Sequence, residues 1–512
     1  MASTQHPPKT PATPPAHAPA TRLERDTMGE MEVPADVLYG ASTQRAVLNF
    51  PVSGRPVPFQ VIHAYALLKS ACAAVNHRLG RLDEARTKAI MEACREIADG
   101  MPALGGWQRH FPVDIFQTGS GTSTNMNANE VIANLAAVRA HHPIGKSKDP
   151  TFIAAGGVHP NDHVNMGQSS NDTFPTAMHV AAALAIKNEL LPAVGAMASR
   201  LSDQAALWDG IVKIGRTHLQ DATPIRLGQE FSGYASQLRH AEERLHRALH
   251  TLGELAIGGT AVGTGINCHE RFGAMVAAEL TESTGIHFRE ASNHFEAQHA
   301  KDACVETAGH LATIAVSLTK IANDIRWLGS GPRCGIGELI FPAVQPGSSI
   351  MPGKVNPVIC ESLIMVSCQV LGNAHAVTLG GLGGVGSLLD LNVAMPVMAA
   401  NLLDSIHLLA RGSSMFTENL LKDLRPDEAR CKALIEGSLA MCTSLVPVIG
   451  YDASAALAKE AFKQGITVRE LAHRTLVGRP DMSGKSITAD DLERALDPRS
   501  MTLPGGEGSA GG

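Results

Sequence analysis

The feature that most constrains this fold is a long apolar stripe between Gln229 and Ala256. Its apolar side chains recur at alternating spacings of three and four residues, at Phe231, Tyr234, Leu238, Ala241, Leu245, Ala248, Leu252 and Leu255. This spacing places them on one face of an α-helix over several heptads. A helix of about thirty residues is about 45 Å long, which is too long for a compact single core. The stripe therefore predicts an extended helical bundle.

Three further helices complete this prediction. One runs from about Ala297 to Leu328, with a seam of mostly small residues at Ala300, Ala303, Thr307, Leu311, Ile314, Leu318, Ile321 and Ile325. The next begins at Pro357, and the last follows Pro396. Because the seams are long and narrow, we expect the bundle to be shared between subunits. A monomeric bundle is the alternative.

Composition agrees with a helical protein and excludes several classes of function. Aromatic residues make up only 4% of the 512 residues, and a core poor in aromatics favours closely packed helices. The formal net charge is −6, which disfavours a nucleic-acid binder. None of the nine cysteines lies in a C-x-x-C pair, so neither a zinc ribbon nor an iron–sulfur centre is indicated. No uninterrupted apolar run reaches about 18 residues, so no membrane span is predicted.

The ends of the chain differ from its body. Residues Met1 to Thr21 are rich in Pro, Ala and Thr, without an apolar core or an arginine, so they resemble neither a secretory signal nor a transit peptide. With scattered unpaired cysteines, this predicts a cytoplasmic protein. We expect a disordered tail at 1–21, an N-terminal domain at 22–168, a central bundle at 169–425, a small C-terminal domain at 426–504 and a flexible tail at 505–512.

Five polar, mostly glycine-containing segments interrupt the helical pattern. They are Gly119–Asn125, His159–Asp162, Gln168–Asp172, Gly215–Pro224 and Gly347–Pro357. Most of them end where a helix is expected to begin. Helix starts expose free N–H groups and a partial positive charge, and both suit anions. Together with Lys354, several such starts predict a site for a small dianion, whereas ordinary helix capping is the alternative reading of any single segment.

Individual caps are expected at three of these starts. Asn356 is expected to cap a helix whose first residue is Pro357, and Thr223 with Pro224 has the same pattern. A third cap is expected within Ser170–Asp172. A further helix is expected to run from about Asn125, directly after the segment from Ser120 to Thr124.

Candidate chemical residues within these segments each have a structural alternative. Histidine exchanges protons near neutral pH, so His218 suits acid–base work, although a lone histidine is more often structural. Lys354 has the alternative of a solvated surface lysine, and Ser348 and Ser349 that of turn residues. Glu361 has the alternative of a favourable charge near a helix start. The residues alone indicate a small-anion enzyme in a helical oligomer.

A metal site at His159 and His163 is not expected. Their spacing of four residues suits a metal on a helix, but Pro160 and the Asn-Asp pair after it predict a loop.

Together the five segments resemble the fumarase/aspartase superfamily. Gly347-Ser-Ser-Ile-Met-Pro-Gly-Lys-Val-Asn-Pro357 is similar to the most specific motif of that family, and the resemblance extends from about Leu23 to about Leu476. Within the superfamily, His218, Ser170 and Gly353 resemble class II fumarases, where aspartate ammonia-lyases tend to have Gln, Thr and Ala. Cys360 before Glu361 is also fumarase-like.

The resemblance implies roles for four catalytic residues in the interconversion of fumarate and L-malate. Ser348 is expected to be the base that removes the C3 proton of malate, with Lys354 helping to stabilise its alkoxide. His218, paired with Glu361, is expected to handle the water or hydroxyl at the other carbon. Acid and base on opposite faces give anti elimination through a carbanion.

The resemblance also implies binding residues, an architecture and an assembly. Substrate carboxylates are expected at Ser120, Gly121, Thr122, Ser169, Ser170, Asn171, Thr217, Ser349, Lys354, Val355 and Asn356, and a second anion site at His159, Pro160, Asn161 and Asp162. The implied fold is all-α with three domains, the central helices of four identical subunits form one core, and each active site takes residues from three chains. No metal or organic cofactor is implied.

One departure from the family pattern bears on specificity. Relatives usually have Gly-Asn-Phe-Glu-Leu-Asn where this chain has Ser387-Leu-Leu-Asp-Leu-Asn392. A leucine at 388 removes hydrogen-bonding capacity and leaves room for a modified dicarboxylate. The alternatives are therefore an ammonia-lyase or another C4-dicarboxylate lyase on the same fold, and a non-catalytic structural protein, which the presence of Ser348, His218 and Lys354 disfavours.

Overall fold

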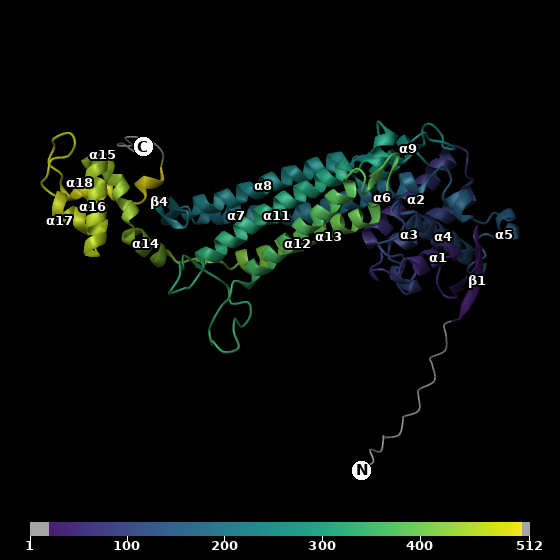
Figure 1. The fold of residues 1–512 in the computed structure, drawn as a ribbon, viewed down its shortest axis with the longest axis horizontal. Helices are drawn as coiled ribbons and strands as arrows, with labels where there is room; N and C mark the ends of the chain where they lie inside the picture. Colours follow the sequence, from purple (N-terminus) through teal and green to yellow (C-terminus); the bar gives the residue numbers. More distant parts are fainter. Residues whose placement is uncertain (1–19, 504–512) are drawn as a thin grey trace, which may run out of the picture. The chain divides into compact units, whose positions relative to one another are not determined.

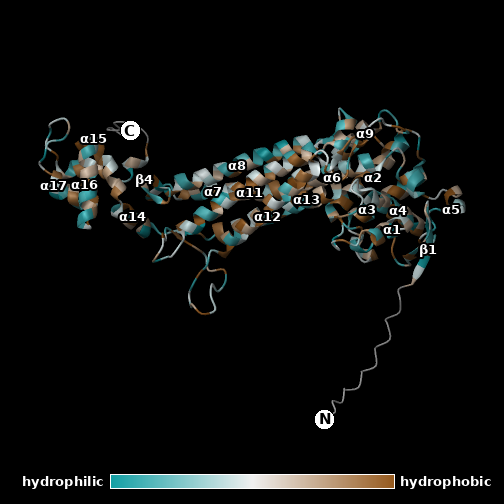
Figure 2. Cartoon of the chain, in the orientation of Figure 1, coloured by the Kyte–Doolittle hydropathy of each residue, from teal (hydrophilic) through white to brown (hydrophobic). Residues whose placement is uncertain are grey.

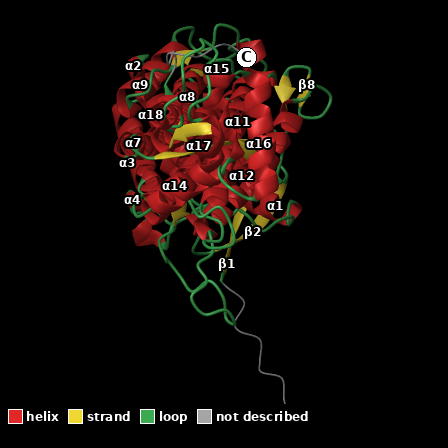
Figure 3. Ribbon diagram, turned by 90° about the vertical axis from the view of Figure 1, so that its left-hand side faces the viewer, coloured by secondary structure: helices red, strands yellow, loops and turns green. Residues whose placement is uncertain are grey.

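The computed structural model describes residues 20–503. The tails expected at 1–21 and 505–512 lie outside this range, except for residues 20 and 21, and Thr21 already belongs to a strand. Helices dominate, and the strands are short and form five two-stranded sheets among the described residues (Figures 1 and 3). The all-α expectation is therefore confirmed.

The described chain divides into two compact units. Unit 1 comprises the residues up to Ala183, His250–Cys304 and Ala376–Leu403, and unit 2 comprises Leu184–Leu249, Val305–His375 and the residues from Asp404. The division into three domains stays a prediction.

Unit 1 begins with a hairpin of β1 (Thr21–Asp26) and β2 (Gly29–Pro34). Its helices are α1 (Ala41–Asn49), α2 (Phe59–Arg78), α3 (Glu84–Ala98), α4 (Thr122–Arg139), α5 (Pro150–Ala154), α6 (Ser170–Ala185), α9 (Phe272–Thr284) and α10 (His294–His299). Strands β5 (Glu254–Leu255) and β6 (Arg289–Glu290) pair in parallel, and β8 (Ser387–Leu388) pairs antiparallel with β9 (Leu391–Asn392). Short η turns occur at Pro102–Leu104, Trp107–Arg109 and Pro160–Val164 (η3).

Unit 2 holds most of the long helices, which run in roughly the same direction across Figure 1. They are α7 (Leu191–Leu207), α8 (Leu227–Leu252), α11 (Asp302–Leu328), α12 (Val358–Gly381) and α13 (Met395–Phe416). The unit also contains β3 (Val212–Thr217), β4 (Gln220–Arg226), β7 (Leu339–Ile340), β10 (Arg425–Pro426) and the helical segments η4 (Ile186–Leu190) and η5 (Thr417–Leu421). Its last elements are α14 (Glu428–Gly437), η6 (Leu439–Leu445), α15 (Val446–Ile449), α16 (Tyr451–Gln464), α17 (Val468–Leu476), α18 (Ala489–Ala495) and η7 (Ser500–Thr502).

The apolar stripe of α8 is buried as predicted. All eight predicted residues, from Phe231 to Leu255, are at most 3% exposed, but α8 ends at Leu252, so Leu255 lies in β5 beyond the helix. Figure 2 shows hydrophobic residues along the bundle helices. The second predicted helix is interrupted: α10 ends at His299 and α11 starts at Asp302, so its buried seam begins at Thr307. The buried lysine between them, Lys301, donates to three carbonyl oxygens at the end of α10, which explains the break.

The last part of unit 2 has a hydrophobic core of its own. It is formed by Ile435, Met441, Leu445, Leu457, Ala461, Val468, Leu471, Ala472, Leu476, Ile487, Leu492 and Leu496. The helices α14, α16, α17 and α18 supply most of these residues.

Two helical stretches are long and apolar enough, by length and composition, to cross a membrane, although neither contains an uninterrupted apolar run of about 18 residues. They are Ser170–Leu207 and Val358–Gly381, and a bent pair at Glu428–Gly437 and Leu439–Ile449 adds a third. Polar residues interrupt both stretches, and a helix buried in a large apolar bundle has the same composition. Only 39% of the most apolar 18-residue stretch of α12 is buried.

Unit 1 contains two further segments of note, His141–Gly156 and the β8–β9 hairpin. The segment from His141 to Gly156 contains the short helix α5, whose Phe152 packs on the His142 ring. The Leu388 departure lies on the β8–β9 hairpin, where Leu388 is 47% and Leu389 is 91% exposed. The Leu388 side chain is therefore partly exposed to solvent and is not buried in a core.

Candidate functional site

The segment carrying His218 is a β-hairpin, not a helix start. Strand β3 pairs with β4 from Val212 opposite Arg226 to Thr217 opposite Gln220, and Pro224 lies within β4 opposite Ile214. The prediction that Thr223 and Pro224 open a helix is therefore wrong. Proline is tolerated here because every strand of a two-stranded ribbon is an edge strand.

The hairpin turn is strained at His218 and Leu219. His218 has φ 57° and Leu219 has φ 60°, so two successive side-chain-bearing residues occupy the left-handed region. Tight two-residue hairpins require positive φ at both positions, which normally selects Gly or Asn. The turn projects an exposed His218 next to Thr217.

A buried ion cluster beneath the hairpin fixes its position. The fully buried Glu338 accepts two hydrogen bonds from the Arg216 guanidinium, at 2.9 and 3.0 Å, and its carboxylate lies 3.3 Å from the Lys213 ammonium. The Lys213 ammonium also lies 3.1 Å from Glu230. A bidentate, desolvated pair of this kind holds geometry well. Sequence reasoning missed Glu338 because no local pattern links it to residues more than a hundred positions earlier.

The segment from Gly347 to Pro357 forms a loop before α12. The Ser348 Oγ accepts hydrogen bonds from the backbone N–H groups of Ile350, at 3.3 Å, and Met351, at 3.1 Å. Asn356 donates its side-chain amide to the Gly347 carbonyl at 2.6 Å, which closes the base of the loop. Two N–H groups directed at one hydroxyl oxygen would stabilise negative charge on that oxygen.

The predicted cap of α12 is displaced by one residue. The Glu361 N–H bonds the Pro357 carbonyl at 3.1 Å, so Pro357 holds the capping position and α12 starts at Val358. The Asn356 side chain closes the loop instead of capping the helix.

The remaining predicted residues on this loop are open to solvent. Ser349, Lys354, Val355 and Glu361 are exposed. Among residues 20–503 no hydrogen bond joins His218 to Glu361, so their expected pairing stays a prediction.

In unit 1, three predicted hydroxyl residues form a chain of hydrogen bonds. The Thr122 hydroxyl lies 2.7 Å from the Ser120 hydroxyl and 2.7 Å from the Ser170 hydroxyl. Gly121 caps α4 with φ 73°, and a Cβ there would lie 1.9 Å from the Phe174 ring. Only glycine therefore fits at position 121, between Ser120 and Thr122. Helix α4 starts at Thr122, three residues before the predicted start.

The start of α6 is capped by Ser169, not within Ser170–Asp172. The Asn171 N–H donates to the Ser169 Oγ at 3.2 Å, and the Ser169 N–H donates to the Asp172 carboxylate at 2.9 Å. Asp172 is fully buried and also accepts from the N–H groups of Gly258 and Thr260. Burial raises the pKa of Asp172 to about 6. The Asn171 side chain donates to the Ala261 carbonyl at 2.7 Å.

The predicted second anion segment is a single helical turn, not a loop. The turn η3 starts at Pro160, and the His159 Nδ1 accepts from the N–H groups of Asn161, at 3.3 Å, and Asp162, at 3.1 Å. The His163 Nδ1 accepts from the His159 N–H at 2.9 Å. Burial lowers the pKa of both histidines. Neutral imidazoles are what this acceptor role requires.

One cleft in unit 1 brings together residues from three of the five predicted polar segments. It has a volume of about 740 Å³ and is lined by Thr122, Asn125, Met126, Asn161, Asp162, Asn165, Met166, Gly167, Gln168, Ser169, Ser170, Thr260, Ala261, Ile266 and Asn267. Hydroxyl and amide groups dominate this lining, as expected for a site that holds small carboxylates. Leu388 is not among the lining residues.

A buried polar network beneath the cleft was not predicted. Lys69 of α2 is fully buried, and its ammonium donates to the side-chain oxygens of Asn165 and Gln168, each at 2.9 Å. Burial lowers the pKa of Lys69 to about 8. The sequence signal was a single lysine in an otherwise apolar stretch of helix, which is weak by itself.

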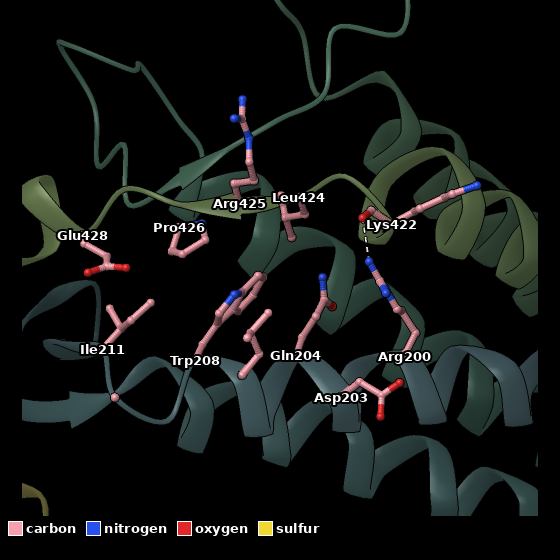
Figure 4. Close-up of a pocket in the computed structure, with 12 residues that line it drawn as sticks. Arg200, Asp203, Gln204, Trp208, Ile211, Lys422, Leu424, Arg425, Pro426 and Glu428 are labelled. Carbon is pink, nitrogen blue, oxygen red and sulfur yellow. Dashed lines mark hydrogen bonds between the residues drawn. The ribbon is translucent and has the colours of Figure 1, made fainter.

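A second cavity, of about 670 Å³, lies in unit 2 and holds none of the predicted residues (Figure 4). Gln204, Trp208 and Leu424 are buried along it, and the Arg200 guanidinium donates to the Lys422 carbonyl at 2.5 Å.

The predicted site residues thus fall into two sets, one in each unit. Unit 1 holds Ser120, Gly121, Thr122, His159, Pro160, Asn161, Asp162, Ser169, Ser170 and Asn171, and unit 2 holds Thr217, His218, Ser348, Ser349, Lys354, Val355, Asn356 and Glu361. Within residues 20–503 no cluster of three His, Cys, Asp or Glu side chains has the geometry to hold a metal ion.

Two family models match this chain. The model described as "Lyase" matches residues 29–372, and the model described as "Fumarase C C-terminus" matches residues 441–503.

Similar proteins are named consistently. The class II fumarate hydratase of Corynebacterium efficiens is 50% identical over 481 residues, covering 94% of this chain and 96% of that protein. The class II fumarate hydratase of Mycobacterium tuberculosis is 49% identical over 483 residues, covering 94% and 96%. The crystal structure of a class II fumarase from Schistosoma mansoni superposes with a TM-score of 0.87 at 37% identity, covering 95% of this chain and 100% of that one.

Proposed function

This chain belongs to the class II fumarate hydratase family, and from that premise we propose that it is a hydro-lyase that interconverts fumarate and L-malate. The observation that carries the proposed mechanism is the Ser348 loop, in which two backbone N–H groups are directed at one side-chain oxygen. The reaction is the reversible anti addition of water to the double bond.

We propose that Ser348 removes the C3 proton of malate as an alkoxide. A serine hydroxyl is a weak base unless its oxyanion is stabilised, and the N–H groups of Ile350 and Met351 supply that stabilisation. The Lys354 ammonium on the same loop adds positive charge. The electron pair left on C3 delocalises into the neighbouring carboxylate to give a carbanion.

The second half of the proposed reaction belongs to His218 and Glu361. The carbanion expels the C2 hydroxyl, which leaves as water after taking a proton from the imidazolium of His218. Glu361 is proposed to orient that imidazole. The strained turn at His218 supports this role, because such conformations persist at functional sites where the surroundings hold them.

We propose that the substrate carboxylates bind hydroxyl, side-chain amide, backbone N–H and ammonium groups of the predicted set. In unit 1 these are Ser120, Gly121, Thr122, Ser169, Ser170 and Asn171, and in unit 2 they are Thr217, Ser349, Lys354, Val355 and Asn356. His159, Pro160, Asn161 and Asp162 are proposed as a second anion site, and the presence of Asn161 and Asp162 in the lining of the unit 1 cleft supports this.

We further propose that the enzyme is a cytoplasmic homotetramer in which each active site takes residues from three chains. The exposed apolar residues of α12, including Met365, Leu371 and Leu379, support burial against other copies. Solvent exposure of His218 and Lys354 in the single chain agrees with a site completed by assembly.

The first experiment follows the ultraviolet absorbance of fumarate after L-malate is added to the purified protein, with and without a chelator. Rapid, chelator-insensitive formation of fumarate supports the proposal. Fumarate formed from aspartate but not from malate would overturn the substrate and leave the fold assignment intact.

The Ser348→Ala variant tests the proposed base. Turnover should fall by at least about 10²-fold, because the alanine cannot accept the C3 proton. Size-exclusion chromatography should show the same oligomer as the wild type. Near-normal turnover would remove Ser348 from the mechanism.

A further inference from the structure

We propose that Lys69 is a positioning residue for substrate binding, whose buried ammonium group orders the wall of the cleft that ends in Ser169 and Ser170. This inference rests on the proposed function and assigns a role to a residue that does not itself touch the substrate.

The ammonium lies directly behind the cleft lining. Lys69 comes from α2 and is fully buried, and its Nζ donates to Asn165 Oδ1 and to Gln168 Oε1, each at 2.9 Å. Both of these acceptor residues line the cleft together with Ser169 and Ser170. Lys69 is thus one contact removed from the groups proposed to bind carboxylates.

Asn165 is the centre of the network. Its Oδ1 also accepts from the side-chain amides of Asn125 and Asn129 in α4, each at 3.2 Å, and its own amide donates to the Gln168 carbonyl at 3.1 Å. Lys69 therefore ties α2 to α4 and to the segment that leads into α6. Cooperative polar networks of this kind fix side chains that would otherwise rotate.

A cation in this place needs a reason, because burial of a charge is unfavourable. A methionine would fill nearly the same volume at no desolvation cost. Charge-assisted hydrogen bonds are about twice as strong as neutral ones, so the ammonium holds two amide oxygens in place more firmly than an amide donor would. The buried carboxylate of Asp172 in α6 offsets part of the charge.

The position of Gln168 sets the position of its neighbours. The Gln168 side chain also donates to the carbonyls of Val164 and Met166, each at 3.1 Å, which folds the segment into one shape. Ser169 follows immediately and caps α6. Without Lys69 the amide oxygens lose their charged donor, and the serine hydroxyls lose a fixed alignment toward the cleft.

Another buried lysine of unit 1 provides a matched control. Lys301 is 1% exposed and donates to the backbone carbonyls of Ala297, Gln298 and Ala300, and none of these residues lines the cleft. A Lys→Met substitution at 69 or 301 removes the same charge from the same kind of environment. Lys69→Met removes a donor from two side chains of the cleft wall, whereas Lys301→Met removes one from backbone carbonyls and reaches the cleft only through Gln298, whose side-chain amide donates to the Thr260 carbonyl at 2.8 Å.

The test compares Lys69→Met, Lys301→Met and the wild type in steady-state kinetics with L-malate and with fumarate. We expect Lys69→Met to raise KM about tenfold or more in both directions while kcat changes by less than about threefold, because ground-state binding is lost. KM of Lys301→Met should stay within about twofold of the wild type. Calorimetric titration of fumarate into the same substitutions made in the Ser348→Ala background provides a readout that does not depend on turnover.

A wild-type enzyme that turns over normally beside a Lys69→Met variant with unchanged KM overturns this inference and leaves the proposed function standing. Equal rises of KM in both variants also overturn it, because the effect would then be general destabilisation. A wild-type protein that neither converts nor binds fumarate overturns both proposals. If Lys69→Met does not fold, Lys69→Gln, which keeps an N–H donor, decides: an unchanged KM overturns the inference and a raised KM supports it.

Discussion

At the scale of single residues, the turn that carries His218 is held in a backbone conformation that neither of its side chains favours. His218 and Leu219 both have positive φ, and Leu219 is 65% exposed, so its side chain contributes little packing in the single chain. Left-handed backbone costs about 1 kcal/mol at a residue other than glycine. The hydrogen-bonded strands and the Glu338 ion cluster hold the turn against that cost.

Replacing Leu219 tests this strain directly. Leu219→Asn should raise the free energy of unfolding by about 0.5–1 kcal/mol, because asparagine tolerates the left-handed region. Leu219→Val should lower it, since β-branched side chains are the least tolerant there. Chemical denaturation of both variants at one protein concentration measures the difference. Identical stabilities would show that the turn is not strained.

At the scale of elements, the starts of helices divide the successful sequence predictions from the failed ones. The start of α12 was predicted to within one residue because Pro357 is compatible with helix geometry. Thr223 and Pro224 have the same local pattern and lie in a strand, because β3 offers a hydrogen-bonding partner that the local sequence does not reveal. A cap motif is therefore informative only together with the periodicity that follows it.

Helix α1 shows a cap supplied from elsewhere in the chain. Its capping residue, Gly40, has no side chain, and the buried Glu130 of α4 accepts instead from the N–H groups of Gly40, Ser42 and Thr43 and from the Thr43 hydroxyl. The carboxylate also suits the positive end of the helix dipole. No pattern within residues 40–49 predicts this contact.

Removing that carboxylate should destabilise unit 1. Glu130→Leu leaves several buried donors without an acceptor, each costing about 1–3 kcal/mol, so the unfolding free energy should fall by about 3 kcal/mol or more. Glu92→Leu on α3, whose carboxylate is 41% exposed, is the matched control and should change it by less than about 0.5 kcal/mol. Equal effects in denaturant titrations would contradict the assigned role of Glu130.

At the scale of the whole molecule, the exposed apolar surface of α12 supports the proposed assembly. Met365 is 66% exposed on a helix whose apolar window is only 39% buried in the single chain. Water-exposed apolar surface of this extent favours association. The apolar composition of this surface, together with the length of the helix, also makes α12 long and apolar enough to cross a membrane.

A charge placed on this surface should prevent the assembly. Met365→Glu is expected to give smaller species in sedimentation analysis and to lose most turnover, because each proposed active site needs several chains. Met28→Glu, at a methionine that is 77% exposed in the β1–β2 turn, is the matched control and should remain assembled and active. A Met365→Glu protein with wild-type mass would exclude α12 from the subunit interface.

The sequence by itself determined the helical architecture, the buried stripe of α8 and the family-specific loop from Gly347 to Pro357. These depend on periodicity and on short contiguous motifs, which are local properties of the chain. Only the tertiary structure decided that His218 lies on a hairpin, that Glu338 holds it, and that Lys69 lies beneath the cleft. Each of these depends on contacts between residues far apart in sequence, and burial of a charged group becomes visible only when its partners are in place.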